Sequence, residues 1–83
     1  MTRETILEGI RNVMAEHLAI REVDERTHLI RDLQLDSIKH LTLVVELENF
    51  FKLRFDEGDE AGLETVEDLV LLISGRLQKE TAR

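Results

Sequence analysis

Apolar residues recur at helical spacing in three segments of this chain, and this pattern limits the possible folds more than any other feature. The first segment has the spacing i, i+4, i+7, i+8, i+12, carried by Ile6, Ile10, Val13, Met14 and Leu18. The last segment repeats helical spacing with Val66, Leu69, Val70, Ile73 and Leu77. No Pro is present to interrupt either segment. The pattern predicts an all-α fold.

The middle segment predicts a helix from about Ser37 to Phe51. At about 100° per residue, its polar residues share one arc roughly 80° wide, formed by Lys39, Thr42, Glu46 and Asn49. Apolar residues fill the rest of the circumference. Because a helix packed on one neighbour needs an apolar stripe of only about 100°, we expect this helix to be central and to contact two or more partners.

The connections between these segments differ in character. Residues 27–35 carry aliphatic side chains that we expect to tuck over the core, namely Leu29, Ile30, Leu33 and Leu35. The acidic stretch 56–64 contains Gly58 and Gly62, which predicts a loop with one short helical turn. The "TVED" that follows matches a capping box, Thr65 with Asp68. The predicted fold is an antiparallel bundle of three main helices plus one short helix, with a long first loop.

Length and composition narrow the possibilities further. With 83 residues we expect residues 1–83 to form a single domain. It has no Cys and no convincing metal site, so stability must come from the 42% of residues that are hydrophobic. No signal peptide and no membrane span are visible, which favours a cytoplasmic protein, expected to be a monomer. The net charge of −7 argues against nucleic acid as a partner.

Enzymatic chemistry is not favoured. The residues His17, His28 and His40 have no metal-ligand spacing, and Ser37 has no evident triad. An EF-hand loop counted from Asp56 would place Gly58 and Ala61 where a calcium ligand and the turn glycine belong. We therefore expect the acidic stretch to be a solvated face or a docking surface.

The stretch "LQLDSIKHL", residues 33–41, is the most informative one. Asp36 followed by Ser37 is an ordinary helix start, with Asp36 as the N-cap. A Ser at this position also has an exposed hydroxyl, and the helix dipole with its free N–H groups favours an attached phosphate. Ile38 is expected to anchor this first turn in the core. The sequence is thus compatible with a plain cap and with a site of covalent modification.

At these residues the chain resembles the acyl carrier proteins, whose hallmark is Asp-Ser-Leu. This chain has Asp36-Ser37-Ile38 at that place. The resemblance extends from about residue 3 to 80 and includes the approach from Leu33, the run "LVVELENFF" and the run "LETVEDLV". It implies a carrier and not an enzyme. A phosphopantetheinyl transferase would attach 4′-phosphopantetheine from coenzyme A to Ser37, with Asp36 part of the recognised motif. The arm would hold acyl intermediates as thioesters for fatty-acid, polyketide or related biosynthesis.

The resemblance also implies docking by acyl-transferring or condensing enzymes. The residues expected to contact them lie on the second helix and the acidic stretch: Ile38, Lys39, His40, Thr42, Val45, Glu46, Glu48, Asp56 and Glu57. Family members usually have acids just after the Ser, where this chain has Lys39, His40 and Thr42, so we expect a dedicated partner set.

A second departure from the family lies two residues before the Asp. A small residue, commonly Gly, is usual there, and this chain has Gln34. Asp36 before the Ser favours acyl over aminoacyl cargo. The alternatives are an aminoacyl or peptidyl carrier, a helical interaction module without a prosthetic group, and a calcium-responsive helical protein.

Overall fold

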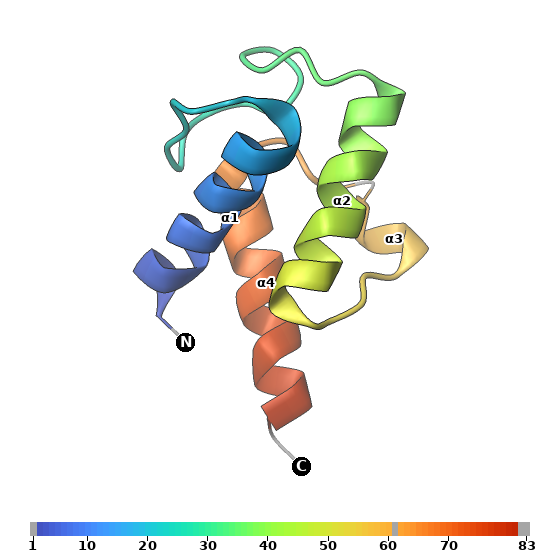
Figure 1. Cartoon of the computed structure of the whole chain (residues 1–83). Helices are drawn as coiled ribbons and strands as arrows, with labels where there is room; N and C mark the ends of the chain where they lie inside the picture. The colour runs from blue at the N-terminus through green and yellow to red at the C-terminus, as the bar shows by residue number, and fades with distance from the viewer. Residues whose placement is uncertain (1, 61, 82–83) are drawn as a thin grey trace.

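The computed structural model describes residues 2–60 and 62–81, and Figure 1 shows their arrangement. That part of the chain forms helices α1 (Arg3–Leu18), α2 (Ser37–Phe51), α3 (Glu57–Glu60) and α4 (Val66–Thr81). α1 runs in the opposite direction to α2 and α4 (Figure 1). The predicted all-α bundle of three main helices plus a short one is confirmed, and so are the predicted bounds of α2.

The helix ends follow from local chemistry. The hydroxyl of Thr2 caps α1 by accepting a hydrogen bond from the Thr5 N–H at 3.2 Å. α1 ends at Ala19, which is left-handed with φ 58°, and the Ile20 N–H donates back to the Met14 carbonyl at 3.1 Å. α2 ends in the same way at Lys52, with φ 57°. Both helices therefore end at a non-glycine residue in the left-handed conformation, which favours glycine.

The core is built from one face of each long helix and from the connections. Its most deeply buried members are aliphatic side chains of α1 (Ile6, Ile10, Val13, Met14), α2 (Leu43, Leu47) and α4 (Val66, Leu69, Val70, Ile73), with Leu29 from the first connection. Fully burying one such side chain stabilises a fold by about 1.5–3 kcal/mol. Among the described residues no polar or charged side chain is buried.

Gly9 lets α1 and the end of α2 approach closely. A Cβ at this position would lie 2.5 Å from Cζ of Phe51 and 2.7 Å from Cε1 of Phe50. Both rings therefore occupy the space that any other residue would fill, and they meet each other edge to face at 4.9 Å between centroids. α1 is the main helix partner of α2.

The first connection is fastened to the start of α4. His28 and Thr65 form an isolated antiparallel bridge. The Leu29 N–H donates to the Glu64 carbonyl at 2.8 Å, and the Val66 N–H donates to the Thr27 carbonyl at 3.0 Å. These bonds satisfy backbone groups that a helix start leaves free. They also hold Leu29 at the centre of the core.

One prediction about the apolar residues of the first connection is wrong. Ile30 does not tuck over the core with Leu29 and Leu35, because its side chain is 60% exposed. α2 packs mainly on α1, and Leu41 and Val45 are exposed on its outer side. The wide apolar arc of α2 is covered on the α1 side and is left open to solvent on the other. Within the described residues, no helix is long and apolar enough to cross a membrane.

Candidate functional site

The first turn of α2 presents a serine hydroxyl to solvent. Asp36 precedes the helix in an extended conformation, and its Oδ1 accepts a hydrogen bond from the Lys39 N–H at 2.9 Å. The Asp36 carbonyl accepts the first helical bond from the His40 N–H, also at 2.9 Å. The predicted N-cap is thus confirmed. Ser37 occupies the first helical position and is exposed.

Hydrogen bonds among its own residues hold the loop before Asp36 in place. His28 Nδ1 accepts hydrogen bonds from the N–H groups of Ile30 and Arg31, at 3.2 and 2.9 Å. The Asp32 carboxylate accepts one from the His28 N–H at 2.7 Å. The Leu35 N–H donates to the Leu29 carbonyl at 3.3 Å. This turn buries Leu35, so the next residues emerge at the surface where α2 begins.

Gln34 shows why this position favours glycine. Its φ of 54° lies in the left-handed region, which costs a residue with a Cβ roughly 1–2 kcal/mol. The chain must turn here so that Leu35 faces the core and Asp36 reaches the helix start. The small residue that is usual in the resembling family would adopt this conformation without strain.

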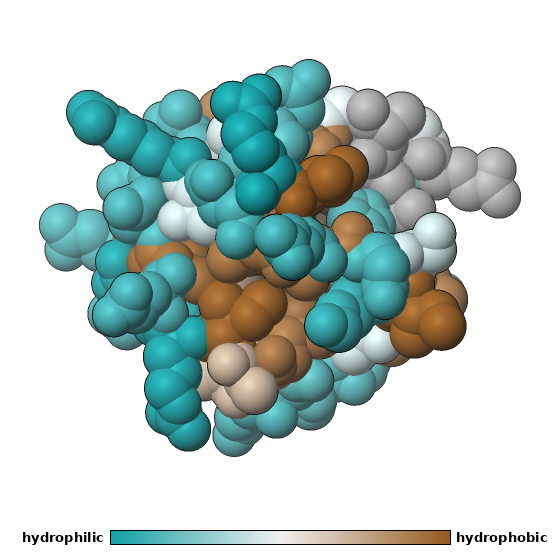
Figure 2. All heavy atoms as spheres, turned by 90° about the horizontal axis from the view of Figure 1, so that it is seen from above, coloured by the Kyte–Doolittle hydropathy of each residue, from teal (hydrophilic) through white to brown (hydrophobic). Residues whose placement is uncertain are grey.

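An open pocket of about 460 Å³ lies beside Ser37. Its walls come from three segments: the first connection and helix cap (Ile30, Leu35, Asp36), the first turns of α2 (Ser37, His40, Leu41) and the segment before α4 (Leu63). Figure 2 views this end of the molecule from above and shows hydrophobic side chains gathered in its middle, framed by hydrophilic ones. The serine hydroxyl therefore borders an aliphatic surface of a size that suits a slender chain.

The outer face of α2 continues this apolar surface. Ile38 is 77% exposed, Leu41 60% and Val45 41%. Their spacing of three and four residues places them along one side of the helix. The prediction that Ile38 anchors the first turn in the core is wrong, because the packing of Leu35 and Leu43 takes that role and turns Ile38 outward. Lys39 is exposed beside this face, and Thr42 turns its hydroxyl to the Ile38 carbonyl at 3.0 Å.

Two acids expected to face partners make contacts within the fold instead. Glu46 lies against α1, with its Oε1 3.5 Å from His17 Nε2 and its side chain only 29% exposed. Glu48 reaches past the end of α2, where its Oε2 accepts a hydrogen bond from the Phe55 N–H at 2.8 Å. Both carboxylates are therefore partly engaged within the fold.

The acidic stretch has an internal counter-ion that the sequence analysis missed. Arg76 of α4 contacts the carboxylates of both Asp56, at 2.7 Å, and Asp59. These two partners raise the pKa of the Arg76 guanidinium above its usual value. Asp56 was expected to face partners and lies within this ion pair, though its side chain remains exposed. Glu57, also expected there, belongs to α3, and its side chain lies outside what is described.

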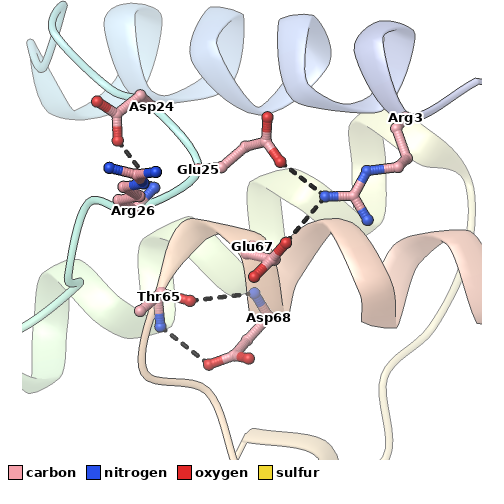
Figure 3. Close-up of polar contacts among 7 residues, drawn as sticks. All are labelled: Arg3, Asp24, Glu25, Arg26, Thr65, Glu67 and Asp68. Carbon is pink, nitrogen blue, oxygen red and sulfur yellow. Dashed lines mark hydrogen bonds and ion pairs between the residues drawn. The ribbon is translucent and has the colours of Figure 1, made fainter.

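The start of α4 offers a contrast within the same molecule. The predicted capping box is confirmed: the Asp68 N–H donates to Thr65 Oγ1 at 3.3 Å, and the Thr65 N–H donates to Asp68 Oδ2 at 3.0 Å. A second backbone donor, the Glu64 N–H, reaches the same Oδ2 at 2.9 Å. The hydrogen bonds from Thr65 and Glu64 lower the pKa of the Asp68 carboxyl. Figure 3 shows this box beside Arg3, which pairs with Glu25 and Glu67 at 2.7 and 3.0 Å.

The structure brings together Asp36, Ser37 and His40, and it adds pocket residues that the sequence analysis did not assign to the site. Those are Ile30, Leu35, Leu41 and Leu63. The spacing of His40 and Leu41, three and four residues after Ser37, was a signal available in the sequence, because such residues share a helix face. Across residues 2–60 and 62–81, no group of three or more His, Cys, Asp or Glu side chains is placed to hold a metal ion.

Comparison with known proteins shows the family of this chain. Residues 8–73 match the model of a family described as "Phosphopantetheine attachment site". Acyl carrier protein 3 of Ralstonia nicotianae is 32% identical over 85 residues, covering 100% of this chain and 98% of that protein. The meromycolate extension acyl carrier protein of Mycobacterium leprae is 30% identical and is matched over 96% of this chain and 70% of its own length.

A solved structure has the same fold. The crystal structure of an acyl carrier protein from Thermotoga maritima superposes with a TM-score of 0.81, over 94% of this chain and 93% of that one, at 24% identity. The two chains therefore share the same fold.

Proposed function

Since this chain belongs to the acyl carrier proteins, we propose that Ser37 is the residue that bears its 4′-phosphopantetheine arm. Proteins of this family carry acyl intermediates on that covalent arm in fatty-acid or related biosynthesis. The observation that supports Ser37 is its exposed hydroxyl directly after the Asp36 cap, inside the matched residues 8–73. The neighbouring pocket fits an arm, since four of its seven lining residues are aliphatic and it is open to solvent.

The roles of the chain's own residues follow from this placement. Ser37 Oγ attacks the phosphorus of coenzyme A that bears the pantetheine, and the new P–O bond replaces the one to the nucleotide half, which leaves as 3′,5′-ADP. The transferase takes up the hydroxyl proton. Asp36 fixes the backbone of the turn, and so the direction of the hydroxyl, through its bond to the Lys39 N–H. When bound, the arm supplies a thiol that holds acyl groups as thioesters.

The chain itself is proposed to present its cargo and not to transform it, acting as a single carrier domain. An arm on an exposed residue can reach several enzymes in turn, and each enzyme supplies its own catalytic groups. The hydroxyl of Ser37 would be consumed by attachment of the arm, so it takes no further part in acyl chemistry.

Partner enzymes are proposed to dock on the α2 face formed by Ile38, Leu41 and Val45 beside the arm. Exposed apolar residues at the centre of a patch provide most of the binding energy, and surrounding charges set on-rates and exclude wrong partners. After Ser37, the first charged residue along α2 is the cation Lys39, and Glu46 and Glu48 make contacts within the fold. The surface next to the arm therefore suits a dedicated enzyme set and not housekeeping fatty-acid enzymes, which bind acidic carriers.

The test of Ser37 is mass spectrometry after incubation with coenzyme A and a broad-specificity phosphopantetheinyl transferase. We expect the wild type to gain one phosphopantetheine mass and Ser37→Ala to gain none, with an unchanged helical circular dichroism spectrum because Ala is a good helix former. The chain's other serine supplies the control, since Ser74→Ala should load like the wild type. An Ala variant at position 37 that still gains the mass would refute the assignment.

The test of partner choice replaces Lys39 with Asp and His40 with Thr in one variant. We expect the loaded variant to be a better substrate than the wild type for a housekeeping ketosynthase, measured as turnover of its acyl form. The wild type working as well as a housekeeping carrier would refute specialisation through α2.

A further inference from the structure

We propose that His40 is a positioning residue that holds the phosphodiester of the arm against the first turn of α2. This rests on the proposed attachment at Ser37 and goes beyond it, because it assigns a second residue of this chain to the arm and gives the arm a preferred direction, over the pocket.

The geometry of the helix puts His40 where the phosphodiester would be. Residues three apart on a helix lie on one face, about 5–6 Å between Cβ atoms. Helical side chains also lean toward the N-terminus, so the imidazole of His40 extends over the turn that contains Ser37. Both side chains line the same open pocket, and His40 is half-buried in its wall.

The side chains of the three histidines differ in the hydrogen bonds and close contacts that they make. His28 Nδ1 accepts two backbone hydrogen bonds, and His17 lies 3.5 Å from Glu46 across the α1–α2 contact. Among the described residues, no hydrogen bond or ion pair engages the His40 side chain. Its two ring nitrogens are therefore available to a group attached next to it.

The charges around the pocket favour this pairing. The carboxylate of Asp36, one residue before Ser37, repels an attached phosphodiester, whereas a protonated imidazole attracts it. Asp36 and His40 are the titratable side chains of the pocket wall, and the segments packed against α2 here contribute the aliphatic residues Ile30, Leu35 and Leu63. Lys39 is exposed on α2 next to Ser37 and adds to the positive potential. A positive charge on His40 would thus offset the charge of Asp36 in the wall of the same pocket.

The experiment is a ³¹P NMR titration of the loaded protein. A phosphodiester keeps its single charge throughout about pH 5 to 8, whereas an imidazole changes charge there, so a pH-dependent ³¹P shift reports a neighbouring histidine. We expect a sigmoidal shift in the wild type, the loss of at least half its amplitude in His40→Gln, and an unchanged curve in His17→Gln. His40→Lys keeps a permanent cation and should hold the ³¹P position near its acid limit over the whole range.

The outcomes separate this inference from the proposed function. Absence of the phosphopantetheine mass would overturn both. Loading with a ³¹P position that is flat from about pH 5 to 8, or a His40→Gln curve equal to the wild type, would overturn the role of His40 alone. Circular dichroism of each variant confirms that the helices are intact, and His40→Lys keeps the proposal testable if His40→Gln fails to fold.

Discussion

α2 and α4 both begin at a side-chain oxygen that caps the helix, yet the two starts have opposite surroundings. At α4 the cap is enclosed: Asp68 accepts two backbone hydrogen bonds, and the N–H groups of Val66 and Glu67 donate to carbonyls of the first connection at 3.0 Å each. At α2 the cap stands at the surface, with Ser37 exposed and a pocket beside it. The same capping chemistry accompanies contacts with another segment at the start of α4 and an exposed serine at the start of α2.

The first turns of the two helices also differ in charge. α4 carries Glu67 and Asp68, whose negative charges stabilise the positive end of the helix dipole. α2 has no acid in its first turn and has Lys39 instead. At α2 the Asp36 carboxylate takes only the Lys39 N–H, so the other free N–H groups of the first turn are open to an anion attached from outside. What distinguishes the proposed modification site at Ser37 from the start of α4 is therefore the surroundings of the cap and not the cap itself.

The largest effect is expected from Asp36→Ala, measured as the rate of loading. The cap should contribute about 1 kcal/mol to stability. The hydrogen bond that the Asp36 carboxylate accepts from the Lys39 N–H orients the turn, and a hydrogen bond to a charged group is worth about 1.5–3 kcal/mol. Because 1.4 kcal/mol is about tenfold in rate, we expect the transferase efficiency to fall about tenfold or more while the protein remains folded. Urea titration of the same variant gives the stability loss. An unchanged loading rate would reduce Asp36 to a cap like that of α4.

Thr65→Ala makes the matched change at α4. Loss of the hydroxyl that accepts the Asp68 N–H should lower the free energy of unfolding by about 1 kcal/mol. Loading should stay at the wild-type rate, because Thr65 does not line the pocket beside Ser37. Urea unfolding and the transferase assay are run side by side. Slower loading of folded Thr65→Ala protein would contradict this difference between the two helices, since it would show that both helix starts serve the site.

The third prediction concerns acid. The folded-state pKa of Asp68 is lowered by the hydrogen bonds from Thr65 and Glu64, so its carboxylate stabilises the fold above the unfolded value of about 3.9. That contribution is lost as pH falls through the lowered folded pKa. Asp68→Asn should therefore cost up to about 1 kcal/mol at pH 7.

The measurement is the difference in unfolding free energy between wild type and Asp68→Asn, from urea titrations at several pH values. We expect the difference to be full at neutral pH and to shrink below about pH 4, near the unfolded pKa. The exposed Glu22→Gln serves as control and should show a smaller difference at every pH. A difference that is independent of pH would mean that the carboxylate charge of Asp68 does not stabilise the start of α4.

Local signals predicted much of this molecule. Both caps, the bounds of α2 and the short turn in the acidic stretch follow from periodicity and from residues within one turn of each other. The exposed side of α2 could not be predicted in this way. Apolar spacing shows that Ile38, Leu41 and Val45 share a face, but whether a neighbour covers that face depends on how the whole chain packs.

Polar contacts between residues far apart in the sequence could not be predicted either. Arg76 meets Asp56 and Asp59 from 20 and 17 residues away, and Arg3 meets Glu67 from 64 residues away. No spacing rule links such pairs. The walls of the pocket beside Ser37 likewise combine three segments that the sequence keeps apart. Within the site, the part predicted was the part that lies on one helix turn.

The smallest effect is expected from Gln34→Gly in the loop that leads to Ser37. Gln34 is left-handed, with φ 54°, which costs roughly 1–2 kcal/mol for a residue with a Cβ. Glycine removes that strain but gains about 0.5–1 kcal/mol of conformational freedom in the unfolded chain. The net result should be a stabilisation of about 0.5 kcal/mol, seen as a small rise in the urea midpoint.

Gln34→Ala separates strain from side-chain contacts. Ala keeps the Cβ and therefore the strain, so it should be no more stable than the wild type. Both variants should load at the wild-type rate, because the left-handed turn is retained and Asp36 still caps α2. A Gly variant less stable than Ala would mean that contacts of the glutamine side chain outweigh the backbone strain. A Gly variant that loads more slowly would mean that the stiffness of this turn helps to hold Ser37 in place.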